Sequence, residues 1–525
     1  MKKSLLALFI MALICLLAAC GNDNASDKDT IEDKGPQNGG SITIGLSGDP
    51  SAFNPLYTAD QTSLIIQQAI YAPLFYTNNG EVTPALAESL TPSEDNLTYT
   101  LKLKENLKWH DNEALTADDI IFTVQSILDE SQNVWTRGSF IFNDQAVEMT
   151  KVDETTVEFT LPIVAPALEV AIQTLYPIPQ HVFENEGDLQ LSVKNDAPVG
   201  SGSFKFVEYK SGQYVKLEKF DDFFGGKPYL DNIIFQILKD DNAGNLALQN
   251  GEVNMKPIKP ADVESIENAG SAEVITYPEN RMTYISFNMN VPELQNVKFR
   301  QALSYTLNRE DMIKAAYGTT DFAEPASSIF TPDVKYQTTD VETYDQDIKK
   351  AKQLLKESGV DTSRDFHIIY VNNNKAYEGM GLYLQQQFKE IGVNLVLDSG
   401  DASATYTIAD DRTSKAYDLY LDGYIMRSEP DAYKMLYKGD ALYNYSNYHN
   451  DHVDSLWETA AVTANGPERE ALYTEIQQTI ASDAVAYPVS YDNNIFALDK
   501  RYGGVKEATP TQITLLRDFS KLYLK

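Results

Sequence analysis

The sequence predicts an α/β protein with several domains, because two different patterns follow one another along the chain. Between about residues 84 and 237, short segments alternate apolar and polar residues, which is typical of strands joined in hairpins. From about residue 348 onward, helical and strand patterns alternate, which indicates a parallel sheet covered by helices. The length of 525 residues is enough for roughly three domains, each with its own core.

The first twenty residues have the pattern of a bacterial export signal. Two lysines precede an apolar run from Leu5 to Leu17, which is too short to span a bilayer as a mature helix. The run ends in Leu-Ala-Ala-Cys20, which resembles a lipobox, in which the cysteine is diacylated and becomes the new N-terminus. We therefore expect a signal peptide over residues 1–19 and a lipid anchor at Cys20 on the extracytoplasmic face of the cell membrane, on a Gram-positive surface. An ordinary cleaved signal with a chance cysteine is the alternative.

Cysteine usage and charge exclude several functional classes. Apart from Cys15 in the signal and Cys20 at the lipid site, the chain has no cysteine, so disulfides, cysteine catalysis and cysteine ligation of a metal are excluded. Without Lys2 and Lys3, 41 of the 43 basic residues remain against 76 acidic ones, a formal charge of −35. This charge repels phosphate backbones and anionic lipid headgroups, so nucleic acid is excluded as a partner.

The elements of the first half follow from local patterns. Residues 20–40 are polar and predict a flexible linker. One clear helix is expected after Thr116, because Asp119 completes a capping box and an apolar stripe runs to Leu128. A shorter helical pattern covers residues 64–70. Strands are predicted by alternation at residues 41–46, 98–103, 156–161, 202–206, 214–217 and 233–237.

The second half is predicted to alternate helices with strands. Two helical faces end at Gly359 and Gly392, and each is followed by a strand pattern. Helices are expected over residues 348–355, 377–391, 453–464 and 467–482. Strands are expected over residues 366–371, 393–397 and 417–421, with short strands near residues 488–497.

One segment, Lys-Trp-His-Asp-Asn-Glu-Ala-Leu-Thr-Ala-Asp-Asp-Ile at residues 108–120, resembles a signature of bacterial extracellular solute-binding proteins of family 5. That family includes oligopeptide-, dipeptide- and nickel-binding lipoproteins of ABC importers. Similar landmarks follow in the family's order and together cover nearly the whole mature chain. They lie at residues 84–89, 200–204, 287–290, 299–303 and 417–419.

The resemblance implies a periplasmic-binding-protein-like fold of class II, cluster C, with two α/β lobes, a hinge and an extra inserted domain. The implied domain I is discontinuous (41–83, 199–283 and 493–525), domain II is inserted (84–198), and domain III covers 284–492. The lobes would close over a ligand, and an ABC permease with its ATPase would receive it. Closure needs ligand contacts that exist only in the closed state, so site residues should face the cleft from both sides.

The resemblance places the first ligand contacts directly after the strand that ends at Leu421. In peptide binders of the family this segment supplies an aromatic residue, main-chain pairing and an aspartate for the α-amino group. Here Met426 or Arg427 takes the place of that aspartate, and an arginine binds a carboxylate rather than an ammonium group. Alternatively, Arg427 pairs with Glu429 or Asp431 at the cleft rim. The expected contacts are Tyr424, Ile425, Met426 and Arg427.

Six further contacts are carried over by position, and the aromatic ones would cover ligand side chains. With 31 tyrosines in the chain, an individual tyrosine is more often core or half-buried surface. Trp109 and Trp457 are interpreted as structural. The six residues are Asp60, Trp135, Arg137, Tyr284, Asn288 and Tyr491.

Two other ligand or reaction classes stay open as alternatives. Nickel binders share the fold, but only His449 and His452 have ligand-like spacing, and we interpret them as part of a solvated loop. A receptor for a metal chelate, such as a metallophore, or for another small carboxylated ligand is the closest alternative. A tethered glycoside hydrolase would need two carboxylates across a cleft, and no catalytic motif appears.

We therefore predict a monomeric peptide-binding lipoprotein of an ABC importer, without enzymatic activity and without a cofactor. A surface chaperone or a signalling-peptide receptor without import would use the same cleft. The sequence leaves open the ligand length, the side-chain preference and the cognate permease.

Overall fold

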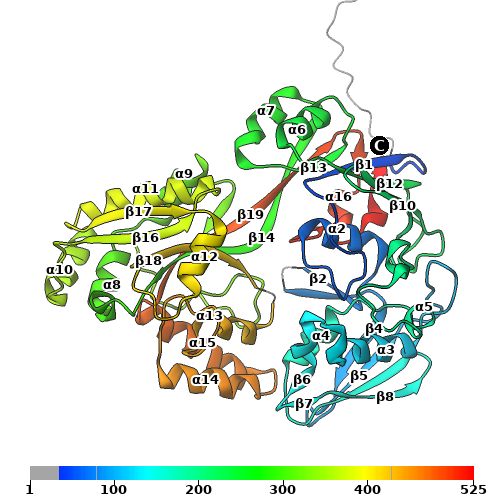
Figure 1. Cartoon of the computed structure of the whole chain (residues 1–525), viewed down its shortest axis with the longest axis horizontal. Coiled ribbons are helices and arrows are strands. Elements are labelled where there is room, and N and C mark those ends of the chain that lie inside the picture. Colours follow the sequence, from blue (N-terminus) through cyan, green and yellow to red (C-terminus); the bar gives the residue numbers. More distant parts are fainter. Residues whose placement is uncertain (1–34, 79, 427) are drawn as a thin grey trace, which may run out of the picture.

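Two long antiparallel strands connect two lobes of the molecule (Figure 1). They are β14 (Ala272–Phe287) and β19 (Ala486–Asp499), and each crosses from one lobe to the other. The structure is a computed structural model that describes residues 35–78, 80–426 and 428–525. We define the first lobe as residues 35–271 and 500–525, and the second lobe as residues 288–485.

The first lobe contains a mixed sheet whose apolar residues alternate as predicted. In this sheet β1 (Ser41–Leu46) lies between β12 (Asn232–Ile237) and β13 (Met255–Pro257) and runs parallel to both. Inward side chains such as Ile44 and Phe235 pack with those of the helix α2 (Gln61–Ile70) in one core. The sheet is extended by the hairpin of β10 (Phe204–Lys210) and β11 (Tyr214–Lys219), and α6 (Asp241–Gln249) and α7 (Val263–Ala269) follow it.

A separate four-stranded sheet is inserted in the first lobe, and the predicted helix packs beside it. That helix is α3 (Ala117–Leu128), which begins with the expected capping box between Thr116 and Asp119. Trp109 is fully buried nearby. The inserted part contains β4 (Ala87–Pro92), β5 (Thr98–Leu103), β9 (Thr156–Thr160), β8 (Glu148–Asp153), α4 (Ala167–Gln173) and α5 (Gln180–Phe183), with the sheet order β4-β5-β9-β8.

The second lobe alternates helices and strands, as predicted. The strands β16 (Asp365–Val371), β17 (Asn394–Gly400) and β18 (Leu419–Ile425) run parallel to one another, and β18 pairs antiparallel with β14. Figure 1 shows α9 (Arg309–Tyr317) and α11 (Lys375–Lys389) above these strands, and α14 (Asp451–Ala461) and α15 (Pro467–Ser482) below them. The remaining helices are α8 (Val297–Ser304), α10 (Ile348–Ser358), α12 (Ala402–Asp410) and α13 (Lys434–Tyr437).

One sheet of eleven strands runs through both lobes in the order β10-β11-β12-β1-β13-β19-β14-β18-β16-β17, with β15 (Ala323–Pro325) paired to β19. The prediction of short strands near residues 488–497 is therefore wrong. A single strand of 14 residues covers that region, because it pairs with β14 along most of its length and with β13 at one end.

The two connecting strands divide their pairing between the lobes. In the first lobe β19 pairs with β13 at residues 496–498, and in the second lobe β14 pairs with β18 from Arg281 onward. Between these points the register of β14 and β19 shifts between Pro278 and Arg281, and Asn280 has a left-handed φ of 54°. Because a bulge bends and twists a strand, this is the bend point of the hinge.

Two hairpins of the first lobe lie outside the main sheets. One joins β2 (Phe75–Asn78) to β3 (Glu81–Pro84), and the other joins β21 (Pro510–Thr511) to β22 (Leu515–Leu516). The chain ends with β20 (Tyr502–Gly503), α16 (Val505–Ala508) and β23 (Tyr523–Leu524). Within the described ranges, every helix is too short or too polar to cross a membrane.

Candidate functional site

A cavity of about 140 Å³ lies between the two lobes. At roughly 10–15 Å³ for each water position, this volume holds on the order of ten waters, the space of a small solute. The second lobe contributes Asp333 and Ser428 to its lining. The first lobe contributes residues of α2, the β2–β3 hairpin, the segment after α4 and the β21–β22 hairpin, namely Leu64, Gln67, Gln68, Pro73, Phe75, Tyr76, Thr77, Asn78, Gly80, Thr174, Tyr176, Thr511, Gln512, Ile513, Thr514 and Arg517.

The first-lobe wall contains polar atoms without partners. The guanidinium of Arg517 lies 5.5 Å from the centre of the Tyr76 ring and 3.5 Å from the hydroxyl of Thr83. Its Nε atom is buried and has no hydrogen-bond partner among the described residues. The same is true of the Oε1 atom of Gln512. Such atoms are uncommon in folded proteins, because an unmatched buried polar group costs about 1–3 kcal/mol. Both atoms have almost no accessible surface, so they are sealed within the wall rather than open to the cavity.

The hairpin that carries these atoms has an unusual backbone. Ile513 and Leu515 have φ values of 65° and 70°, in the left-handed region. For a β-branched residue such as Ile513 this conformation is sterically costly, and strain of this kind concentrates at ligand and switch sites. The side chain of Gln68 donates to the carbonyl of Arg517 at 2.5 Å and so holds the end of the hairpin to α2.

The second-lobe wall is built around a buried acid. The Asp333 side chain is 4% exposed and accepts a hydrogen bond of 2.6 Å from the hydroxyl of Thr331. Burial raises the pKa of Asp333, and hydrogen bonds from Thr331 and Asn280 only partly offset that rise. Gly80 of the first lobe approaches here so closely that a Cβ on it would lie 3.1 Å from the carbonyl oxygen of Asp333.

A second contact between the lobes lies at the far rim. The side chain of Asn465 donates to Oε2 of Glu169 at 2.9 Å, which joins the second lobe to the inserted part of the first. Arg469 donates a hydrogen bond of 2.9 Å to the side-chain oxygen of Asn465. It also forms a buried ion pair of 2.5 Å with Glu429. A fully buried arginine thus orients the amide that bridges the lobes.

The suggested acidic partners of Arg427 are paired elsewhere. Glu429 pairs with Arg469, and Asp431 pairs with Lys434 at 2.7 Å. Arg427 itself lies outside the described residues, as does Cys20. Ser428, the next residue in the chain, lines the cavity.

Four of the predicted site residues are buried within the second lobe and the hinge, and the side chains of three of them, Tyr424, Tyr491 and Asn288, form hydrogen bonds there. Tyr424 donates to the carbonyl of Ile329 at 2.6 Å, and its ring lies 5.1 Å from that of Tyr284. The hydroxyl of Tyr491 contacts the carbonyl of Ser328 at 2.9 Å. The side chain of Asn288 donates to the carbonyls of Tyr417 and Ser414 at 2.9 and 3.0 Å.

The other described predictions are distributed over both lobes. Asp60 caps α2 and accepts hydrogen bonds from Ser51 and Ser63; burial alone would raise its pKa, but these bonds lower it. Arg137 binds the carbonyl of Leu128 and the carboxylate of Glu130 in its own lobe, and Trp135 is 64% exposed. Ile425 and Met426 are half-buried. None of the nine described residues of the predicted set lines the cavity.

Sequence reasoning missed the residues that line the cavity with charge, Arg517 and Asp333. Neither stands in a periodic pattern or in a recognised motif. Arg517 follows two leucines close to the C-terminus, and Asp333 lies in a long irregular segment. Arg517 is one of six basic residues among the last 26 of the chain, so its residue type alone did not identify it.

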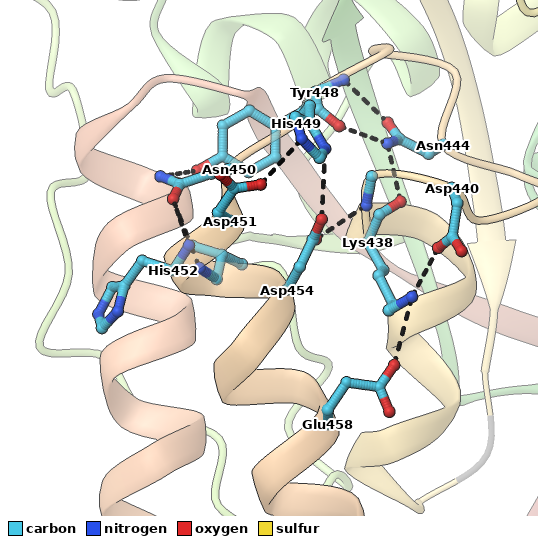
Figure 2. A network of polar contacts seen from close by, with 12 residues as sticks. Lys438, Asp440, Asn444, Tyr448, His449, Asn450, Asp451, His452, Asp454 and Glu458 are labelled. Carbon is cyan, nitrogen blue, oxygen red and sulfur yellow. Dashed lines mark hydrogen bonds and ion pairs between the residues drawn. The ribbon is translucent and has the colours of Figure 1, made fainter.

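The pair of histidines with ligand-like spacing does not converge on one point (Figure 2). His449 contacts Asp451 at 3.0 Å and Asp454 at 3.3 Å, whereas His452 points away and pairs with Glu475 at 2.8 Å. Both histidine side chains are more than half exposed. Within the part of the chain that the structure describes, no group of three potential metal ligands is assembled.

The chain matches the family described as bacterial extracellular solute-binding proteins, family 5 Middle, over residues 81–447. The match covers more than half of the sequence. The chain belongs to this family. Its members are substrate-binding components of transport systems, and the resemblance noted in the sequence is confirmed.

Similar proteins support the family and the fold. The oligopeptide-binding protein AppA of Bacillus subtilis is 30% identical over 535 aligned residues, which cover 96% of this chain and 97% of that protein. The structure of the ABC transporter substrate-binding protein CtaP from Listeria monocytogenes matches with a TM-score of 0.91 and 56% identity, covering 93% of this chain and all of that chain. The structure of Bacillus subtilis AppA in complex with a nonapeptide matches with a TM-score of 0.73 at 28% identity, covering 94% and 100%. The predicted two-lobed fold is thereby confirmed.

Proposed function

We propose that this member of the family is the substrate-binding lipoprotein of an ABC importer, which captures peptides between its lobes and delivers them to the permease. The cavity lined by residues of both lobes carries this proposal. The similarity to the oligopeptide-binding protein AppA of Bacillus subtilis, whose structure contains a nonapeptide, supports the ligand class.

The hinge gives the capture mechanism. The lobes are connected by two paired strands with a bulge at their bend, so a rotation about this point separates Asp333 and Ser428 from the first-lobe wall. A ligand that touches both walls makes its full set of contacts only in the closed state. Its binding energy therefore shifts the population toward closure, and the permease receives a distinct loaded shape.

The remaining features of the proposal follow from the sequence. We place a diacylated Cys20 at the new N-terminus, a linker over residues 20–40, and a monomeric, non-enzymatic body on the extracytoplasmic face of a Gram-positive membrane. The domain boundaries implied by the family, at 83/84, 198/199, 283/284 and 492/493, remain part of this proposal. The last two pairs of residues lie in β14 and β19, the strands that cross between the lobes.

The residues carried over from the family also remain proposed ligand contacts. Arg427 has the best structural support, because its neighbour Ser428 lines the cavity. Arg427→Ala should weaken an acidic ligand by more than about 1 kcal/mol, the scale of a charged hydrogen bond. Unchanged affinity by calorimetry would remove Arg427 from the site.

A metal chelate or another small carboxylated solute is the second candidate ligand. One observation favours it: Arg517 lines the cavity and forms no ion pair with the described residues. A glycoside hydrolase has less support, because among the described residues of the cavity lining Asp333 is the only one with a carboxylate, and such chemistry needs two.

Native mass spectrometry of the body from residue 21 onward, purified from its own host, tests the proposal. We expect a retained peptide mass that is released on unfolding. A retained metal chelate would favour the second candidate, and hydrolysis of a glycoside panel would contradict both. Deleting the gene should also abolish growth on peptides as sole amino-acid source, whereas unchanged growth would contradict import.

A further inference from the structure

We propose that Asn280, Asp333 and Gly80 form a latch that couples the bend of the hinge to closure of the lobes. Asn280 lies at the bend, Asp333 in the second-lobe wall of the cavity, and Gly80 in the turn of the β2–β3 hairpin of the first lobe. This inference rests on the proposed capture function and applies to any solute that the cavity holds. It assigns part of the stability of the closed form to contacts within the protein, in addition to those of the ligand.

The backbone of Asn280 has a conformation that belongs to one bend of the hinge. Asn280 lies inside the register shift between Pro278 and Arg281, has a φ of 54° and is 4% exposed. This left-handed conformation is unfavourable for most residues, and asparagine is among the few that adopt it routinely. Because β14 bends here, a rotation of the lobes changes the backbone angles of this segment. The direction of the Asn280 side chain therefore depends on the hinge angle.

The Asn280 side chain reaches the wall of the cavity. It donates a hydrogen bond to the carboxyl of Asp333, which also accepts one of 2.6 Å from the hydroxyl of Thr331. Thr331 is fully buried, and its hydroxyl lies 3.0 Å from that of Tyr433 in the core of the second lobe. Asp333 is thus held from two sides, by the core of its lobe and by the hinge.

The first lobe meets the main chain of Asp333 with a glycine. Asn78 pairs with Glu81, so Gly80 lies in a two-residue turn, and Figure 1 shows β2 on the side of the first lobe that faces the second. Gly80 has a φ of 78°, and a Cβ on it would lie 3.1 Å from the carbonyl oxygen of Asp333, closer than an ordinary van der Waals contact. Gly80 is itself exposed, so the lobes can separate at this contact without opening a hydrophobic core.

The three residues connect the two ends of one motion. The hinge angle directs Asn280, Asn280 and the core position Asp333, and the main chain of Asp333 receives the turn at Gly80. Loss of any one member should therefore shift the population from the closed form toward the open one. A bound solute should then leave faster, whereas its first encounter with the open form should change little.

The test measures the distance between the lobes. From residue 21 onward the chain has no cysteine, so two introduced cysteines are the only sites for spin labels. Leu191 in the first lobe is 78% exposed and Leu442 in the second is 64% exposed, so Leu191→Cys with Leu442→Cys places one label on each lobe. Pulsed electron paramagnetic resonance gives the closed and open fractions, without ligand and with a pool of random peptides of two to nine residues. Native mass spectrometry after dilution gives the rate at which the pool is released.

Asn280→Gly removes the amide and leaves the left-handed backbone accessible. We expect the ratio of closed to open form to fall about fivefold, the scale of one hydrogen bond, and peptide release to accelerate by about the same factor. The association rate should change less than about twofold. Asn96→Gly is the matched control, because Asn96 has a φ of 57° and lies in the turn between β4 and β5, outside the cavity lining. Equal closed fractions in the two variants would overturn the latch.

A pair of glycines separates backbone strain from closure. Gly80 and Gly212 lie in hairpin turns with φ values of 78° and 70°, but a Cβ on Gly212 meets no atom within 4 Å. Gly80→Ala and Gly212→Ala should therefore lower the unfolding midpoint equally, and only Gly80→Ala should reduce the ratio of closed to open form, by about threefold. Equal ratios in both would overturn the contact.

The double variant tests the coupling itself. Asn280→Gly with Gly80→Ala should lose less than the product of the two single losses, because both act on the position of Asp333. A loss equal to that product would mean that the two ends act independently, and the latch would be overturned.

Failure of the latch differs from failure of the proposed function. If the wild-type body retains no peptide from the pool and its label distances do not change, peptide capture is contradicted. The comparison of unliganded wild type with unliganded Asn280→Gly still decides the latch, and equal closed fractions overturn it. If the wild type closes on peptides and Asn280→Gly closes and releases them equally, capture stands and the latch is wrong.

Discussion

The two walls of the interlobe cavity differ in how completely their polar groups are matched. In the second lobe, Asp333 lines the cavity and accepts a hydrogen bond from Thr331. In the first lobe, Arg517 and Gln512 keep a buried donor and acceptor without partners among the described residues. A matched buried group stabilises the folded lobe, whereas an unmatched one costs stability. The two walls therefore differ in how much a substitution should change stability.

The largest loss of stability is expected at the buried ion pair of the second lobe. Glu429→Gln removes the carboxylate that pairs with the fully buried Arg469. Breaking one side of a buried pair costs about 3–5 kcal/mol, because the remaining charge is left uncompensated. Urea unfolding of the body should show this loss. Lys434→Gln, at a pair more than a third exposed on the lysine side, is the control and should change stability by less than about 1 kcal/mol.

Arg517→Gln should weaken ligand binding and leave the stability of the unliganded protein nearly unchanged, the opposite of what is expected for Glu429→Gln. Without ligand, its unfolding midpoint should stay close to that of the wild type, because Arg517 forms no ion pair with the described residues and its hydrogen bond to Thr83 is long, at 3.5 Å. With a captured peptide, the ligand-induced rise in midpoint should fall by the equivalent of about tenfold in affinity, about 1.4 kcal/mol. Differential scanning calorimetry with and without peptide measures both. A large loss of stability without ligand would mean that Arg517 is structural, and the contrast between the walls would disappear.

The stability of the protein should depend on pH through a buried acid, Glu279, in the hinge. Burial raises the pKa of Glu279 to about 7; nearby Arg281 opposes this rise and Asp492 adds to it. The folded state therefore binds a proton that the unfolded state has already released between pH 4.5 and 7, so stability is highest below that window and falls as pH rises through it. After allowance for solvent screening we expect a loss on the order of 1 kcal/mol.

Glu279→Gln should reduce this slope without abolishing it, because burial also raises the pKa of Asp333 and Asp492. The exposed Glu273→Gln on the same strand should leave the slope unchanged. Urea unfolding at intervals between pH 4.5 and 7.5 measures the effect. A slope of the same size in the Glu279→Gln protein would assign the pH dependence to another group.

The smallest effect is expected at the rim. Asn465→Ala removes the hydrogen bond to Glu169 that bridges the lobes. It should destabilise the closed form relative to the open form by about 0.5–1.5 kcal/mol. The unfolding midpoint should change little, while small-angle scattering of the unliganded body should show a larger radius of gyration. An unchanged scattering profile would mean that the rim contact does not hold the lobes together.

Much of the fold could be predicted because many elements carry their own local signal. The helix α3 has both its capping box and its apolar stripe, and α10 ends at Gly359, whose φ is 66°. The strand β14 was not predicted, although it is the longest in the described structure. Its bulge shifts the side-chain alternation at residues 278–281, and its second half is buried on both faces, so a period of two does not persist.

The cavity could not be predicted from the sequence. Arg517 meets Thr83 and Tyr76, which precede it by more than 400 residues, and the lobes bring Asp333 to the same space. No local sequence pattern predicts contacts between residues so far apart in the chain. The aromatic residues Tyr284 and Tyr424 were easier to select because they stand next to family landmarks, yet the structure packs them against each other.

A crystal structure of the body with the peptide that native mass spectrometry identifies tests the central claim most directly. We predict a peptide between the two lobes, in contact with Arg517 of the first-lobe wall and with Asp333 or Ser428 of the second-lobe wall. A peptide bound outside the interlobe cavity would contradict this claim.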